Sequence, residues 1–267
     1  MSASLIISTY NWPEALRLCL MSVKAQKIPP TEVIIADDGS GEATRELILS
    51  FQQNFPVPLK HIWHGDEGFR LAAIRNKAIA AAETDYIIQI DGDLILHRRF
   101  VEDHLQLSKP GFFTTGSRVL LSAKTTINLI NHHSIDLRKY GSGQTNFMNG
   151  IHNRFIRNFL ADRYKIHGKH KYYVKGCNMS FWKKDLIAVN GYNEAFTGWG
   201  REDSEIAIRM INAGIKKQFI KMAAICYHLH HKEASRDFEE KNILMMQEVI
   251  EKGTVIAADG LSKHFNS

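Results

Sequence analysis

Short runs of Ile, Val and Leu alternate with helical segments through the first third of the chain, and this alternation constrains the fold more than any other feature. The apolar runs predict strands at residues 5–7, 33–36, 59–63 and 86–90. The segments between them predict three helices, the first of them capped by Asn11 with Glu14 three residues on. The resulting β-α-β-α-β-α-β order predicts an α/β fold, with a mostly parallel, doubly wound sheet flanked by helices.

Polar clusters stand where three of these strands end. They are Thr9-Tyr10-Asn11, Asp37-Asp38 and Asp91-Gly92-Asp93. An Asp-Gly pair by itself is typical of a turn. In doubly wound sheets, however, ligands bind outside the carboxyl ends of the strands, so three clusters on one rim predict a site. The sequence has neither a G-x-G-x-x-G fingerprint nor a P-loop, which argues against the usual dinucleotide and NTPase sites.

Two aspartates and two histidines have the character of metal ligands. Asp91 and Asp93 can share a divalent cation, and carboxylate oxygens suit Mg²⁺ and Mn²⁺. His228 and His230 follow a strand predicted near residues 223–227, and alternate residues of an extended chain point to the same face. Because Mn²⁺ also accepts imidazole, we expect Mn²⁺ (or Mg²⁺) to bind these residues.

A tryptophan between two glycines precedes a run of acids in Gly198-Trp199-Gly200-Arg201-Glu202-Asp203-Ser204-Glu205. Glycines let a backbone approach a ligand closely, and the face of Trp199 suits a sugar ring. A carboxylate beside it can take a proton from an attacking hydroxyl. Alternatively, the acids simply favour the N-terminal end of a helix dipole, and both interpretations are compatible.

Positive charge is concentrated in one segment. The whole chain carries +6, but residues 118–172 hold ten Lys or Arg and two Asp, a net charge of +8. Such a segment suits an anionic partner, and no nucleic-acid-binding motif accompanies it. Apolar residues between 151 and 160 recur at helical spacing, which predicts a helix that either packs on its own domain or lies on an anionic membrane surface. Three scattered cysteines, no leader-like start and no long apolar run predict a cytoplasmic protein, free or peripheral on the inner face of a membrane.

Five blocks of the sequence together resemble a family 2 glycosyltransferase of the Rossmann-like GT-A fold. The blocks are STYN at 8–11, ADDGSGEATRE at 36–46, GFRLAAIRNKAI at 68–79, DYIIQIDGD at 85–93 and GWGREDSEIAIRM at 198–210. The last block is similar to that of bacterial chondroitin-type polymerases and of β-1,4-galactosyltransferases. The resemblance covers residues 1–100 and 173–235 well and says little about 118–172.

The resemblance implies inverting, metal-dependent transfer of a sugar from a nucleotide donor, usually a UDP-sugar, to a hydroxyl of a glycan or lipid-linked acceptor. It implies that the nucleotide and pyrophosphate contact Thr9, Tyr10, Asp38, Arg70, Arg75 and Asp91. Tyr10 is then expected near the base, and Asp38 is expected to accept a base N–H.

The same resemblance implies that Asp91 and Asp93 bridge ribose, metal and diphosphate. His228, with or without His230, then completes the metal shell. Asp203 matches the catalytic base, and the residues that match the acceptor-sugar site are Trp199, Gly200 and Glu202. Ser204 stands where galactosyltransferase relatives often carry another Asp, a departure that bears on acceptor geometry.

These assignments divide the chain into a nucleotide-sugar-binding half (1–117), a basic insertion facing an acceptor or a membrane (118–172) and an acceptor-binding and catalytic half (173–267). One Asp-x-Asp and one GWGRED block predict a transferase of a single sugar, acting in bacterial surface polysaccharide or lipopolysaccharide synthesis. Two alternatives stay open from the residues alone, a sugar nucleotidyltransferase and a non-catalytic carbohydrate-binding protein. The sequence does not fix the particular UDP-sugar, the acceptor, the linkage or the oligomeric state.

Overall fold

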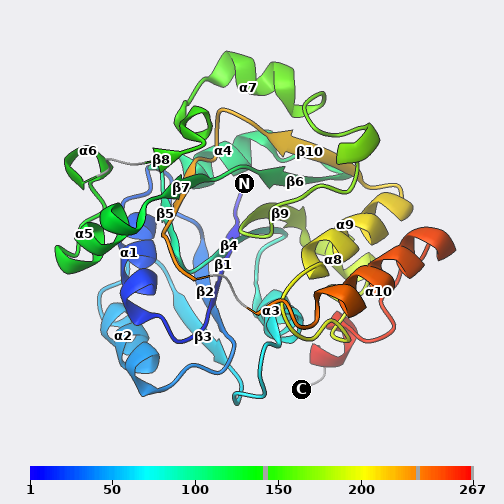
Figure 1. Ribbon diagram of the computed structural model, residues 1–267, viewed down its shortest axis with the longest axis horizontal. Coiled ribbons are helices and arrows are strands. Elements are labelled where there is room, and N and C mark those ends of the chain that lie inside the picture. The colour runs from blue at the N-terminus through cyan, green and yellow to red at the C-terminus, as the bar shows by residue number, and fades with distance from the viewer. Residues whose placement is uncertain (141–143, 233–234, 266–267) are drawn as a thin grey trace.

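The computed structural model describes residues 1–140, 144–232 and 235–265, and a seven-stranded sheet runs through its centre (Figure 1). Its strands are β1 (Ser4–Thr9), β2 (Glu32–Asp37), β3 (Leu59–Trp63), β4 (Tyr86–Asp91), β6 (Phe112–Gly116), β9 (Asn178–Trp182) and β10 (Lys216–Ile220). Their order is β10-β6-β9-β4-β1-β2-β3. Only β9 runs antiparallel to its neighbours, β4 and β6. The predicted α/β fold with a mostly parallel sheet is therefore confirmed.

A smaller four-stranded sheet joins distant parts of the chain. Its strands, in spatial order, are β5 (Leu94–Leu96), β11 (Cys226–His228), β7 (Val119–Leu121) and β8 (Gln144–Thr145). β11 runs antiparallel to β5 with His228 opposite Leu94. This register brings His228 and the following His231 beside Asp93, which immediately precedes β5.

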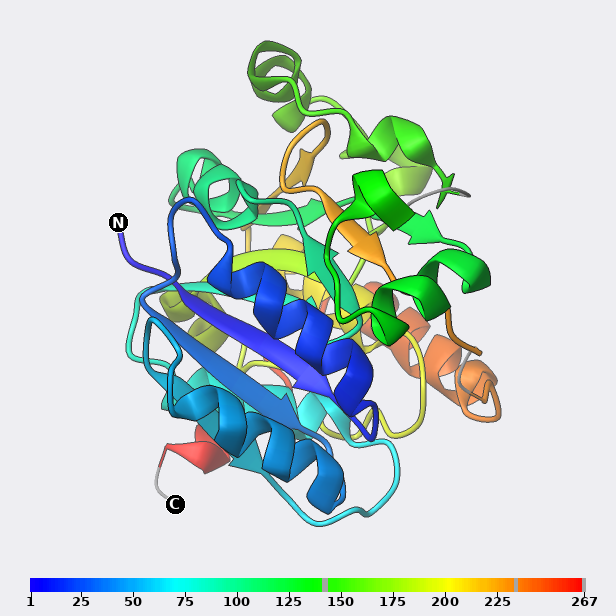
Figure 2. The same cartoon turned by 90° about the vertical axis from the view of Figure 1, so that its left-hand side faces the viewer.

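Helices cover both faces of the central sheet. One face packs against α1 (Pro13–Lys24), α2 (Glu42–Gln52) and α4 (Phe100–Leu107), and the other against α3 (Leu71–Ala81), α8 (Lys183–Ala188) and α9 (Glu202–Asn212). Figure 2 shows α1 and α2 lying across β1 and β2. The remaining helices are α5 (Ala123–Asn131), α6 (Leu137–Tyr140), α7 (Arg154–Ala161), α10 (Glu239–Lys252) and the short 3₁₀ turns η1 (Phe147–Gly150), η2 (Gly168–His170) and η3 (Leu261–His264).

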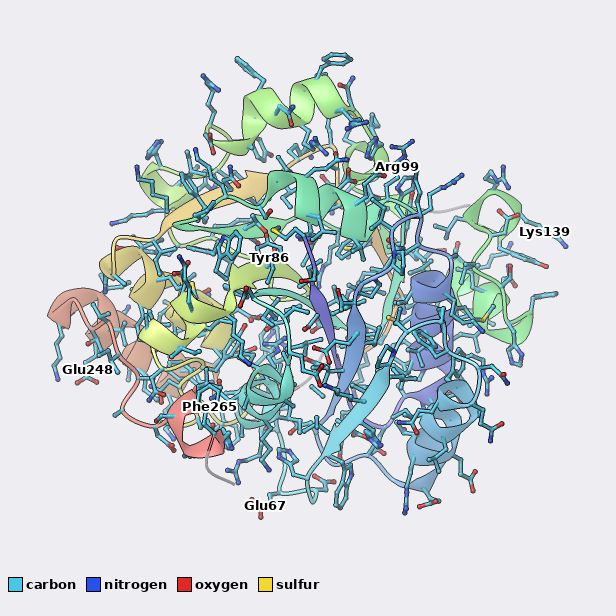
Figure 3. All side chains as sticks on the ribbon, turned by 180° about the vertical axis from the view of Figure 1, so that it is seen from behind. Glu67, Tyr86, Arg99, Lys139, Glu248 and Phe265 are labelled. Atoms are coloured by element: carbon cyan, nitrogen blue, oxygen red, sulfur yellow. The ribbon has the colours of Figure 1, made fainter. Side chains whose placement is uncertain are left out.

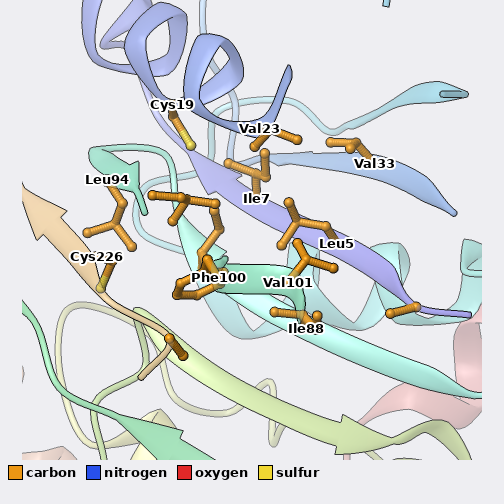
Figure 4. Packing of buried hydrophobic residues seen from close by; sticks show 14 of the residues in the cluster. Leu5, Ile7, Cys19, Val23, Val33, Ile88, Leu94, Phe100, Val101 and Cys226 are labelled. Carbon is orange, nitrogen blue, oxygen red and sulfur yellow. The ribbon is translucent and has the colours of Figure 1, made fainter. Parts of the chain in front are cut away.

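The core explains why the strands read as continuous apolar runs. All six residues of β1 are buried, because both faces of the sheet are covered. Leu5 and Ile7 pack with residues of α1 and α4 (Figure 4). Ile6, on the opposite face of the strand, packs with residues of α3. Burial of each such side chain stabilises the fold by about 1.5–3 kcal/mol.

The predicted cap of the first helix is wrong. α1 begins at Pro13 after Trp12, and no side chain caps it. Asn11 instead adopts a left-handed conformation with φ of 45°. Its Oδ1 accepts the N–H of Gly41 at 2.9 Å and its own N–H donates to the Ser40 hydroxyl at 2.8 Å. The side chain ties the loop after β1 to the loop after β2, and this long-range use outcompetes the local cap.

The helices of the described residues are all too short or too polar to cross a membrane. The basic segment 118–172 contributes β7, β8 and a series of short helices, with α5 and α6 at the left and α7 at the top of Figure 1.

Candidate active site

A cavity of about 1010 Å³ opens at the carboxyl ends of β1 and β4. At this point the chain order of the sheet reverses, because β2 lies on one side of β1 and β4 on the other. Doubly wound sheets bind their ligands at such a point. The structure brings most of the sequence-predicted residues to this cavity, namely Thr9, Tyr10, Asp38, Arg75, Asp91, Asp93, Trp199, Gly200, Glu202, Asp203, His228 and His230.

Arg75 lies at the centre of the site and is almost fully buried. Its guanidinium donates to Asp203 Oδ1 at 2.9 Å, to Asp91 Oδ1 at 3.1 Å and to the Ser8 hydroxyl at 3.2 Å. Burial alone would disfavour its charge, but the surrounding carboxylates, Asp203 foremost, raise its pKa. The guanidinium thus couples the end of β4 to the start of α9.

Asp203 is held from one side only. Its Oδ1 accepts from Arg75 and from the Tyr192 hydroxyl at 3.3 Å, and that hydroxyl also donates to Gln89 Oε1 at 2.8 Å. Its Oδ2 lies against the backbone of Gly176, where a Cβ would come within 1.6 Å. Among the described residues no hydrogen bond reaches Oδ2, so this oxygen remains for a ligand.

Glu202, the neighbour of Asp203, has fewer polar contacts. It is buried, its Oε1 is 3.8 Å from Arg75, and its Oε2 has no hydrogen-bond partner among the described residues. Burial raises its pKa well above the ordinary range, and the Asp203 charge raises it further. A buried carboxyl with a raised pKa is typical of functional sites.

Glu205, the third acid of the cluster, is structural. It pairs with the buried Arg209 at 2.7 Å, and Arg209 donates to the carbonyls of Val189 and Gly191.

The turn before α9 requires unusual backbone. Gly198, Gly200 and Arg201 have φ of 73°, 106° and 77°. A Cβ at Gly198 would come within 2.4 Å of the Phe238 ring, so glycine is needed for contact as well as conformation. The result is a half-exposed Trp199 at the cavity mouth, with the Arg236 guanidinium 5.4 Å from its ring centre.

The cavity is also lined by Asp38 and Tyr10, which follow β2 and β1. Asp38 is buried, and burial raises its pKa above the ordinary value. Its Oδ1 contacts His64 at 2.7 Å and its Oδ2 accepts the Arg70 backbone N–H at 2.9 Å. A base N–H would therefore share one of these oxygens. Tyr10 is exposed and donates to Asp66 at 2.9 Å.

Arg70 lies differently from the prediction. Its guanidinium pairs with Glu67, and the side chain lines a separate, smaller cavity with His64 and Lys77. Only its backbone reaches Asp38, so the structure does not direct the Arg70 side chain into the main cavity.

Three groups with metal-ligating character converge at Asp93. Its Oδ2 is 3.2 Å from His228 Nε2 and 3.1 Å from His231 Nε2. Its buried Oδ1 has no hydrogen-bond partner among the described residues. One carboxylate with an orphaned oxygen and two imidazoles fit a divalent ion such as Mn²⁺.

The histidine pair differs from the predicted one. β11 ends at His228, so the extended spacing that would align His228 with His230 does not continue. Both His230 and His231 are exposed, but the His230 backbone N–H donates to Thr126 while His231 Nε2 lies beside Asp93. Asp91 also faces Arg75 rather than this cluster.

Sequence reasoning did not assign site roles to Arg118, Gly176 and His231, which line the cavity, or to Tyr192, which supports Asp203. The run His228-Leu229-His230-His231 contained a signal for His231, but the end of β11 decided which of these histidines contact Asp93. Arg118 was counted only within the basic segment. Nothing local singles out Gly176 or Tyr192, because their roles depend on contact with Asp203.

Comparison with known proteins decides the family. The model of glycosyl transferase family 2 matches residues 4–172, well over half of the chain. The chain belongs to glycosyl transferase family 2. A second model, the N-terminal domain of galactosyltransferase, matches residues 157–232. Both matches extend into segment 118–172, about which the sequence motifs say little.

Curated relatives of this family 2 glycosyltransferase are longer proteins. Chondroitin synthase of Escherichia coli is 27% identical over 84% of this chain and 34% of its own length. Chondroitin synthase of Pasteurella multocida is 26% identical over 93% of this chain and 27% of its own length. The chain thus spans about a third of the first and about a quarter of the second. Validoxylamine A glucosyltransferase of Streptomyces hygroscopicus is 24% identical over 79% of the chain and 48% of its own length.

Solved structures confirm the GT-A type of fold. TarS residues 1–349 from S. aureus superposes with a TM-score of 0.66 at 14% identity, covering 99% of this chain and 68% of that one. The family assignment favours glycosyl transfer from a nucleotide-sugar donor over the nucleotidyltransferase and carbohydrate-binding alternatives.

Proposed function

We propose that this glycosyltransferase is an inverting, metal-dependent enzyme that takes its sugar from a UDP-sugar. The acceptor is a hydroxyl of a glycan or lipid-linked glycan in bacterial surface polysaccharide or lipopolysaccharide synthesis. The observation that carries the proposal is the bridge from Asp91 through Arg75 to Asp203, because it connects a donor-type carboxylate cluster to an acceptor-side carboxylate across one cavity.

On the donor side, Thr9, Tyr10 and Asp38 receive the uridine and Asp91 its ribose. Support comes from their position at the carboxyl ends of the parallel strands. TarS has been solved in complex with UDP and with UDP-GlcNAc, at 14–15% identity to this chain. The Arg118 side chain lines the same cavity and offers a second cation for the diphosphate.

Asp93, His228 and His231 would hold the divalent ion. When bound, the ion stabilises the negative charge that develops on the departing diphosphate. The protein fixes the positions of these three side chains. Asp93 immediately precedes β5, His228 ends β11, and His231 lies three residues beyond it.

On the acceptor side, Trp199 and Glu202 position the acceptor sugar, with Gly200 allowing close approach. Asp203 Oδ2 takes the proton of the attacking hydroxyl as its oxygen bonds to the anomeric carbon. The bond from that carbon to the diphosphate breaks, and UDP leaves with the electron pair. Attack from the face opposite the leaving group inverts the anomeric centre, so an α-linked donor gives a β-linked product.

The test is UDP release from a panel of UDP-hexoses and UDP-N-acetylhexosamines, each with Mn²⁺, with Mg²⁺ and with chelator. Slow donor hydrolysis requires no acceptor, so the panel reads out donor choice directly. We expect metal-dependent release from one donor. Release that chelator leaves unchanged would overturn the metal role. No release, together with no thermal stabilisation by UDP, would overturn the choice of nucleotide.

A further inference from the structure

Helix α7 carries its apolar face outward. Phe155, Ile156 and Phe159 lie within about 100° of one another on the helix. Phe155 is 91% exposed and Phe159 63% exposed, and Ile156 is also exposed. We call these three residues the α7 patch. Single exposed apolar side chains are ordinary, but a cluster with two phenylalanines marks an interaction surface.

The orientation of α7 is fixed by its polar side. Arg157 lies opposite the patch, is buried, and donates to Asp103 at 3.1 Å and to Gln106 at 3.2 Å. Asp103 is itself buried on α4 and also accepts from His152 and from the Ala224 N–H. Turning the patch inward would leave Asp103 without its guanidinium, and an uncompensated buried charge costs about 3–5 kcal/mol. The outward patch is therefore built into the fold, and side chains of α7 project from the edge of the molecule in Figure 3.

Positive charge accompanies the patch along the chain. Arg154 is exposed on the same helix, and the exposed Arg163 guanidinium lies 4.7 Å from the Phe159 ring centre. Lys169 and Lys171 are exposed farther along the same basic segment. The segment 118–172 carries +8 overall. A second copy docked on the same patch would bring two such segments together, which like-charge repulsion disfavours. An apolar stripe containing phenylalanine and flanked by Lys and Arg fits an anionic lipid surface, with the rings between acyl chains and the cations at the phosphates.

We propose that the α7 patch and its basic surround dock this enzyme on anionic bilayers. The inference goes beyond the proposed transfer chemistry and does not rest on it. Docking of this kind uses one short interfacial helix and long cationic side chains, so it is reversible and weakens with salt.

The experiment is co-sedimentation of the 267-residue chain with vesicles of phosphatidylcholine alone and of phosphatidylcholine with phosphatidylglycerol. Two variants test the two components, Phe155→Ser/Phe159→Ser and Arg163→Gln/Lys169→Gln/Lys171→Gln. Leu244→Ser is the matched control, because Leu244 is also exposed but lies on α10, away from α7 (Figure 1). All substituted side chains are exposed, so thermal unfolding should change little.

We expect the unmodified chain and Leu244→Ser to bind only the anionic vesicles. We expect each test variant to bind at least about 10-fold more weakly. Failure of the unmodified chain to bind anionic vesicles would overturn the proposal, as would equal binding to both vesicle types. Self-association that Phe155→Ser/Phe159→Ser abolishes, without any vesicle binding, would assign the patch to a second copy instead.

Discussion

Replacing Asp203 by Asn separates the proposed base from every other role of that side chain. Asn keeps an oxygen for the donors that now reach Oδ1, Arg75 at 2.9 Å and Tyr192 at 3.3 Å, and it changes no volume. Arg75 retains its contact with Asp91 at 3.1 Å, so the buried cation stays paired. We expect a loss of folding stability of about 1–2 kcal/mol, the scale of weakening one charged hydrogen bond.

The effect on rate should be far larger than the effect on stability. A positioned general base contributes about 10²–10⁴-fold, or about 3–5 kcal/mol of the activation barrier. We therefore expect kcat for UDP release to fall by at least about 100-fold in Asp203→Asn. Thermal stabilisation by UDP should be retained, because the uridine contacts proposed at Thr9, Tyr10 and Asp38 use other side chains of the cavity.

Glu202→Gln is the matched control. Burial and the Asp203 charge raise the pKa of Glu202, so its carboxyl is favoured in the neutral form and Gln is close to it in shape and charge. We expect kcat to change by less than about 10-fold. Near-normal turnover of Asp203→Asn would refute the base assignment. A loss in Glu202→Gln equal to that in Asp203→Asn would transfer the role to Glu202.

Three further outcomes follow from other contacts. Gly176→Ala places a Cβ 1.6 Å from Asp203 Oδ2, so the carboxylate must move, and we expect at least about 10-fold slower UDP release; Gly65→Ala, where the added Cβ meets nothing within 4 Å, should be unaffected. His231→Ala should raise the Mn²⁺ concentration for half-maximal activity by at least about 10-fold, whereas His230→Ala should not. Equal effects of the two variants in a Mn²⁺ titration would contradict His231 as a metal ligand. Burial lowers the pKa of His104 from 6.5 to about 4, so the unfolded chain takes up a proton between these values that the folded chain does not, and stability falls as pH drops through this window. His104 therefore contributes about 3 kcal/mol to the loss of unfolding free energy over this range. In urea titrations of His104→Gln, the unfolding free energy should depend less on pH between 6.5 and 4. An unchanged pH dependence would exclude His104 as the cause.

Much of the site was already present in the sequence because its residues follow recognisable strands. The alternation of apolar runs and helices placed Asp38, Asp91 and Asp93 at strand ends, and parallel strands put those ends on one rim. The block around Trp199 could be recognised as a candidate site from its composition, since packing alone rarely requires glycines and acids adjacent to a tryptophan. These signals are local, so periodicity and spacing suffice to read them.

Other features were decided by contacts between segments far apart in the chain. Which histidines contact Asp93 depends on where β11 stops pairing with β5. Because β11 ends at His228, His231 rather than His230 lies beside Asp93. The link from Asp91 to Asp203 runs through the buried Arg75 of a third element.

The amphipathic helix α7 makes the same distinction most clearly. The sequence determined that the helix has an apolar and a polar side, because helical spacing alone sets that pattern. Only the tertiary structure decided which side faces out. The buried Asp103 on α4 requires a counter-charge, Arg157 supplies it, and the phenylalanines are left on the surface. The fold pairs the buried Asp103 charge and leaves the two rings exposed, and no local pattern in the sequence contains that choice.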